Sequence, residues 1–111
     1  MDDSLSDLEI TPSEVKARLA RGDKFLFVDV REKWEYETSR IEGAVLIPLR
    51  EIPEKLAALA KAGEIVLFCH HGVRSLDAAA WLHSQGVEKA RSMSGGIERW
   101  ATEIDPSVPR Y

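Results

Sequence analysis

The sequence predicts an α/β fold, namely a small doubly wound, mostly parallel sheet of four to five strands with helices on both faces. Residues 24–30 and 64–68 are almost continuously apolar, which is typical of strands that are covered on both faces. Segments with helical spacing and helix-end signals alternate with these runs. Because strand–helix–strand units are right-handed, such an alternation places helices on both sides of one sheet.

The first half of the chain begins with a well-signalled helix. Thr11 is suited to its N-cap, Pro12 to its first position and Glu14 to a capping box, while Gly22 ends it. The next predicted elements are the strand 24–30, a short helix or turn around Trp34, and the strand 44–47.

The second half continues the alternation. Two helices, 51–63 and 75–86, are expected to bury Ile52, Leu56, Leu59 and Ala60 in the first case and Leu76, Ala79, Ala80 and His83 in the second. The strand 64–68 separates them. The last predicted elements are the strand 90–93, a short helix over 95–104 and an irregular tail over 105–111.

Length and charge limit the classes of function. A chain of 111 residues fits one domain, 1–111, and we expect residues 1–8 to be flexible. With 19 acidic and 15 basic residues the chain has no excess of positive charge, so nucleic acid is not an expected partner. The start MDDSLSDLE is not a signal peptide, and no apolar run approaches about 18 residues, so we expect no membrane association and a cytoplasmic location.

The single cysteine, Cys69, directly follows the apolar strand 64–68. Ligands of parallel sheets bind beyond the carboxyl ends of the strands, which is where Cys69 is expected. Gly72 allows a tight loop, and a helix is predicted from about Ser75. Inward-facing N–H groups and the positive end of that helix would favour the thiolate. The candidate site therefore consists of Cys69 as nucleophile and a substrate-binding loop formed by His70, His71, Gly72, Val73, Arg74 and Ser75.

Three other interpretations of the polar and aromatic residues stay open. A lone cysteine that ends a strand is often just a small buried hydrophobic residue, although three potential cations nearby, from HHGVR, favour a reactive thiol. A structural zinc site needs about four ligands at regular separations, whereas the chain has one Cys and three His, so no metal and no cofactor are predicted. The tryptophans are interpreted as packing residues; they are Trp34, Trp81 and Trp100.

The loop CHHGVRS after IVLF resembles the active-site loop of rhodanese-like sulfurtransferases. The segments FVDVREKWEYETSRIEGAVLIPL and GVEKARSMSGGIERW extend the resemblance over nearly the whole chain. The tail IDPSVPRY is similar to the end of the rhodanese-like domains that are fused to sulfur-carrier adenylyltransferases. Four residues separate Cys69 from Arg74, as in the sulfurtransferase pattern, whereas related phosphatases have five.

The resemblance implies that Cys69 carries sulfane sulfur as a persulfide, taken from thiosulfate or from a protein persulfide. The implied acceptor is a thiol, cyanide or a sulfur-carrier protein. Many thiosulfate-using members have Lys or Arg where this chain has His70, so a protein persulfide is the better expected donor. Asp29 and Arg31 are expected to form a structural ion pair that orders the loop from the neighbouring strand. The alternatives are a docking module without catalysis and an arsenate reductase or phosphatase.

Overall fold

A computed structural model describes residues 8–111 of the chain, so the flexibility expected for residues 1–7 lies outside the described residues. The described part contains a five-stranded parallel sheet, in the spatial order β1-β5-β4-β2-β3. Its strands are β1 (Glu9–Ile10), β2 (Leu26–Asp29), β3 (Val45–Leu46), β4 (Ile65–Phe68) and β5 (Ala90–Met93). The predicted fold class is confirmed, with β1 as a strand that the sequence analysis did not predict.

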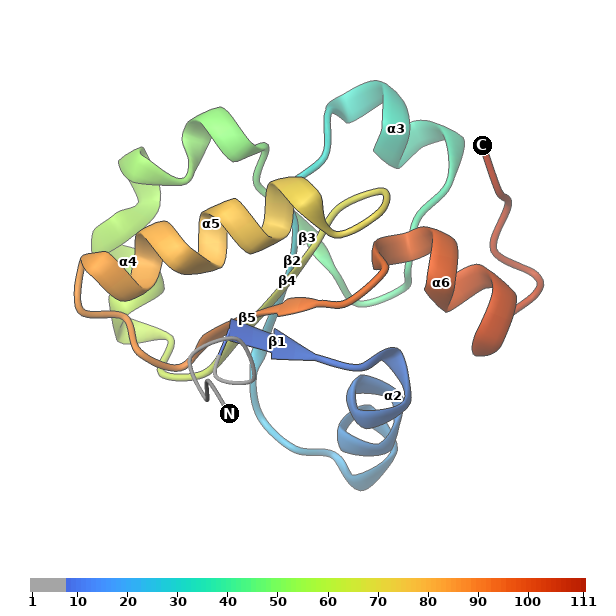
Figure 1. The fold of residues 1–111 in the computed structure, drawn as a ribbon, viewed down its shortest axis with the longest axis horizontal. Helices are drawn as coiled ribbons and strands as arrows, with labels where there is room; N and C mark the ends of the chain where they lie inside the picture. Colours follow the sequence, from blue (N-terminus) through green and yellow to red (C-terminus); the bar gives the residue numbers. More distant parts are fainter. Residues whose placement is uncertain (1–7) are drawn as a thin grey trace, which may run out of the picture.

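Five helices within residues 9–111 accompany the sheet, with helices on both of its faces (Figure 1). They are α2 (Pro12–Arg21), α3 (Lys33–Thr38), α4 (Leu56–Lys61), α5 (Val73–Ser84) and α6 (Gly96–Glu103). Residues of α4 and α5 pack on one face of the sheet, and residues of α2 and α6 pack on the other.

The apolar strands β2 and β4 are buried on both faces because their side chains alternate between two cores. Val28 and Leu67 face α4 and α5, whereas Phe27 and Val66 face α2 and α6. In the register of the two strands, Asp29 lies opposite Phe68. Residues 30–31 and 69–70 therefore leave the sheet at the same edge.

Two predicted helices differ in detail from the observed ones. The segment 51–63 is divided into the 3₁₀ turns Leu49–Glu51 and Pro53–Lys55, followed by the shorter α4. Pro53 has no N–H to donate to an α-helical hydrogen bond, which explains why a continuous α-helix does not pass through it. Ile52 and Leu59 are buried as expected, but Ala60 is exposed, so that assignment was wrong.

The helix after Cys69 begins at Val73 rather than at about Ser75. Its buried side chains are Ser75, Ala78, Ala79 and Leu82. The predicted face was therefore wrong for Ala80, which is exposed. The earlier start has a consequence for the site, since Arg74 belongs to the first turn of α5 and not to the loop.

Three further expectations can be compared with the structure. Thr11 caps α2 by accepting the N–H of Glu14 at 3.2 Å, and Gly22 ends that helix with a positive φ of 76°. Trp100 is buried and Trp81 is half-buried, but Trp34 is 60% exposed, so the packing role predicted for Trp34 was wrong.

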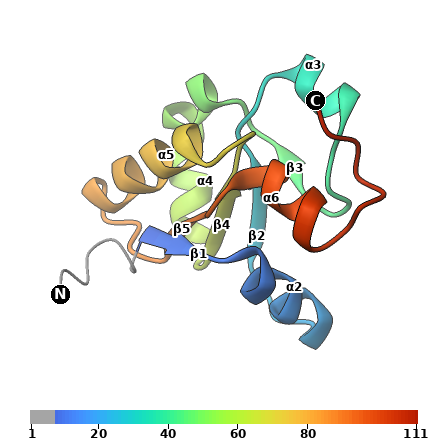
Figure 2. The same cartoon turned by 45° about the vertical axis from the view of Figure 1, so that its right-hand side comes forward.

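The segment 105–111 has no regular structure, as predicted, and it runs from the end of α6 back to α3 (Figure 2). Val108 anchors this segment in the core beneath α2 and α6. Within residues 8–111, no helix has the length and apolar character needed to cross a membrane.

Candidate active site

Cys69 lies at the carboxyl end of β4, where the chain turns into α5. Its Sγ accepts the backbone N–H groups of Gly72 at 3.1 Å and of Ser75 at 3.4 Å. Gly72 precedes α5 with a φ of 104°, a conformation that favours glycine. Two amide donors and the positive end of α5 thus face the sulfur, and both stabilise negative charge on it.

The loop is held from outside by the first turn of α6. The N–H groups of Ile97 and Glu98 donate to the carbonyl oxygens of Cys69 and His70 at 2.9 Å and 3.1 Å. Because the N–H and C=O of a trans peptide point in opposite directions, these bonds turn the N–H groups of residues 70 and 71 away from α6. This close approach requires Gly96, since a Cβ there would meet both carbonyl groups.

Two buried serines complete the immediate surroundings of the sulfur. The Ser75 Oγ lies 3.4 Å from the Cys69 Sγ and 2.7 Å from the Ser92 Oγ of β5. Ser75 was predicted as part of the site, whereas Ser92 was not. Its position in the short strand 90–93 carries no local signal for this role, because only the pairing of β4 with β5 brings it there.

Arg74 does not point at the sulfur as a free cation. Its guanidinium forms a two-pronged ion pair with Glu35 of α3, with N–O distances of 2.7 Å and 2.9 Å. Glu35 is 3% exposed, so this carboxylate is an internal partner of the loop. The sequence analysis missed Glu35, which lies 39 residues before Arg74.

The predicted ion pair between Asp29 and Arg31 is present and fully buried. Arg31 donates to both carboxylate oxygens of Asp29, at 2.9 Å and 2.7 Å, and to the carbonyl oxygens of Glu35 and Ser39. Arg31 therefore holds the carboxyl-terminal half of α3, through the carbonyl groups of Glu35 and of the C-cap residue Ser39. It acts on the loop through Glu35 and not by a direct contact with Cys69.

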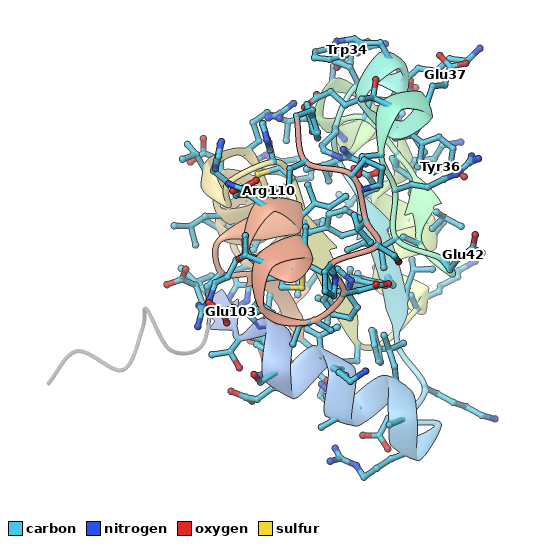
Figure 3. The ribbon with its side chains drawn as sticks, turned by 90° about the vertical axis from the view of Figure 1, so that its right-hand side faces the viewer. Trp34, Tyr36, Glu37, Glu42, Glu103 and Arg110 are labelled. Carbon is cyan, nitrogen blue, oxygen red and sulfur yellow. The ribbon has the colours of Figure 1, made fainter. Side chains whose placement is uncertain are left out.

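Tyr111 brings the segment 105–111 onto the site. Its hydroxyl donates to the Glu35 carboxylate at 2.7 Å and accepts from the Arg31 guanidinium at 2.8 Å. Burial, together with the hydrogen bond to Glu35, raises the pKa of Tyr111 to about 12, so the phenol stays protonated and can donate. The Trp34 ring meets the Tyr111 ring edge-on at 6.0 Å, and Trp34 lies at the outer edge of the molecule (Figure 3).

The two histidines of the loop are stacked rather than pointed at the sulfur as cations. The His70 ring lies between those of Tyr111 and His71, with centroid distances of 3.9 Å and 4.0 Å. Burial, and then the neighbouring His71, lower the pKa of His70 below its ordinary value of 6.5. His70 therefore adds little positive charge at neutral pH, although the sequence counts it among the potential cations of the loop.

The surroundings of Cys69 combine burial with polar contacts. Cys69 is 1% exposed, whereas Val73, at the start of α5, is 70% exposed. A cysteine that served only as a small hydrophobic residue would not need two amide donors and a hydroxyl around its sulfur. Since so little of the residue is exposed, loop side chains have to move before a bulky donor reaches the sulfur. Within residues 8–111, no cluster of three or more His, Cys, Asp or Glu side chains is suited to a metal ion.

Protonation of the Glu35 carboxyl at acid pH is expected to lower the free energy of unfolding. The hydrogen bonds from Arg74 lower the pKa of this buried carboxyl from 4.5 to about 2. Such a depressed pKa stabilises the folded state above pH 4.5, by about 3 kcal/mol, and the contribution is lost as the pH falls towards 2. We expect the difference in unfolding free energy between the protein and Glu35→Gln, measured in urea, to shrink over that range. A constant difference would contradict the assignment.

The fold and the site together define a class: a parallel α/β domain with a cysteine at the N-terminus of a helix, whose sulfur accepts backbone amides. These features are those of the rhodanese-like domain family, and the sequence model of that family matches residues 11–103. The chain belongs to the rhodanese-like domain family.

Relatives with known names agree with this assignment. The probable adenylyltransferase/sulfurtransferase MoeZ of Mycobacterium tuberculosis is 38% identical over 104 residues, which are 92% of this chain but 26% of MoeZ. A sulfurtransferase of Allochromatium vinosum is 33% identical, over 90% of this chain and 94% of its own length. A rhodanese-like domain protein of Staphylococcus aureus has a similar structure, with a TM-score of 0.78, 30% identity and coverage of 94% and 98%. The chain thus spans about a quarter of MoeZ and nearly all of the other two proteins.

Proposed function

We propose that this protein is a sulfurtransferase that carries sulfane sulfur as a persulfide on Cys69. The donor is thiosulfate or a protein persulfide, and the acceptor is a thiol, cyanide or a sulfur-carrier protein. The observation that carries the proposal is the set of donors on the Cys69 Sγ, which are the amides of Gly72 and Ser75 at the start of α5. Relatives named sulfurtransferases support the same class of reaction.

The chemistry requires an ionised sulfur that attacks another sulfur atom. The Cys69 thiolate forms a bond to the outer sulfur of thiosulfate while the S–S bond of thiosulfate breaks, and sulfite leaves with the bonding pair. The product is a persulfide anion on Cys69, so three negative charges stand on each side of the step. The attack of an acceptor thiolate on the outer sulfur then restores the Cys69 thiolate. The amides that stabilise the thiolate also suit the persulfide anion.

The proposed reaction is tested by mass spectrometry of the intact protein after incubation with thiosulfate or with a persulfide-loaded cysteine desulfurase. We expect a mass increase of one sulfur atom, located at Cys69 by peptide mapping and reversed by cyanide with release of thiocyanate. Absence of the added sulfur with both donors would refute the proposal and favour a docking module. Turnover of arsenate or an aryl phosphate in its place would favour the reductase or phosphatase alternative.

A further inference from the structure

The charges around the candidate loop are neutralised by internal partners. Arg74, the loop-side cation nearest in sequence to the cysteine, is held by both oxygens of Glu35. Arg110 pairs with the Glu98 carboxylate at 2.6 Å, and the backbone N–H of Glu98 donates to the loop carbonyl of residue 70 at 3.1 Å. Positive charge from these two arginines is therefore matched by a carboxylate in each case.

Arg74 and Glu35 both stay ionised across the ordinary pH range, so the net charge of the pair is zero. The pKa of Glu35 is lowered to about 2 by the hydrogen bonds from Arg74, and the same bonds raise the pKa of Arg74. Arg74 directly precedes Ser75 in the first turn of α5, and the N–H of Ser75 donates to the Cys69 Sγ at 3.4 Å, so the pair is attached to the turn that holds the sulfur. Both members of the pair therefore act on a charged donor, with opposite signs.

We propose that Glu35 determines which sulfur donors the site accepts, by cancelling the charge of Arg74 and so disfavouring a doubly charged donor. This inference rests on the proposed sulfur transfer to Cys69 and names its preferred substrate class. That class consists of donors whose sulfane sulfur carries a single negative charge or none, such as persulfides and thiosulfonates. Thiosulfate, a dianion, would need a net positive site.

The hydrogen bonds that hold the Glu35 carboxylate support this role. Its carboxylate is buried and receives the hydroxyl of Tyr111 and the N–H of Glu32, at 2.7 Å and 3.0 Å, in addition to Arg74. These donors keep the carboxylate facing Arg74. In contrast, backbone amides provide the stabilisation at the sulfur itself. A monoanion can be held by such dipoles, whereas a second negative charge in a poorly solvated site requires a cation.

The test compares two donors that differ by one charge and transfer the same kind of sulfur. Thiosulfate leaves sulfite, and methanethiosulfonate, a monoanion, leaves methanesulfinate, with identical bond changes at Cys69. We would measure the second-order rate constant of sulfur loading for each donor by mass spectrometry, and take the ratio of thiosulfate to methanethiosulfonate. For Glu35→Gln we expect this ratio to rise about tenfold, the order of effect of one unit charge in a partly screened site.

Arg74→Gln is the complementary variant, because it leaves the Glu35 charge without its cationic partner. Its ratio is expected to fall, again by about tenfold. The double variant Glu35→Gln/Arg74→Gln removes both charges and should return close to the ratio of the unchanged protein. Glu103→Gln is the matched control, since it removes the same kind of charge from an exposed pair with Arg99 on α6, outside the site. Its ratio should not change.

The outcomes separate the two proposals. Failure of both donors, and of a persulfide-loaded cysteine desulfurase, to load the unchanged protein would refute the sulfur-transfer function. Loading of both donors with the same ratio in all variants would leave that function in place and overturn the role of Glu35. Circular dichroism checks that each variant is folded, and if Glu35→Gln does not fold, the fall in the ratio of Arg74→Gln decides alone. Salt should reduce the differences if charge causes them.

Discussion

Replacement of Cys69 by serine is expected to abolish sulfur loading, with a decrease of at least about a thousandfold, the size typical for removal of a catalytic nucleophile. Cys69 is the one cysteine in the 111-residue sequence, so the chain holds no second thiol that could take its place. A serine hydroxyl stays protonated at neutral pH and does not form a persulfide. Serine can still accept the N–H groups of Gly72 and Ser75, so the fold should persist.

The measurement is the rate of sulfur gain by intact mass, with thiosulfate, methanethiosulfonate and a loaded cysteine desulfurase as donors. Urea unfolding of the same samples shows whether Cys69→Ser remains folded. Normal thiocyanate production by the folded serine variant would show that transfer does not pass through Cys69. Such a result would remove the basis of the proposed function.

Substitution of Gly96 by alanine is expected to lower the unfolding free energy by about 3 kcal/mol or more, a loss reserved for strained or overpacked sites. Gly96 has a positive φ of 60°, and an added Cβ would lie 2.5 Å from the carbonyl oxygen of His70 and would also clash with that of Cys69. Both obstacles are backbone atoms of the loop and cannot rotate away. The clash can therefore be relieved only by a shift of the loop backbone, so the rate of sulfur loading should fall together with stability.

Gly63→Ala provides the matched control for this substitution. Gly63 also has a positive φ, of 80°, but no atom lies within 4 Å of the position of its added Cβ. Its expected cost is about 1–2 kcal/mol, from the left-handed conformation alone, with sulfur loading unchanged. Equal losses of stability in the two variants, measured by urea unfolding, would show that the contact between α6 and the loop carbonyls is not tight.

Much of the fold follows from local patterns in the sequence. The apolar runs 24–30 and 64–68 predict β2 and β4, because strands buried on both faces need apolar side chains at every position. The position of Cys69, between β4 and a helix start, follows from the same pattern. The predicted burial was wrong for Ala60 and Ala80, which are exposed. Helical spacing alone does not show which edge of a helix meets the core.

The sequence by itself determined a parallel α/β domain with a single cysteine between a buried strand and the N-terminus of a helix. Only the tertiary structure decided which groups surround that cysteine: Ser92, Glu35 and Tyr111 come from β5, α3 and the segment 105–111. The physical reason is that strand and helix periods express contacts between near neighbours along the chain. Glu35 meets partners that are 39 and 76 residues away, and such contacts depend on how the finished elements pack.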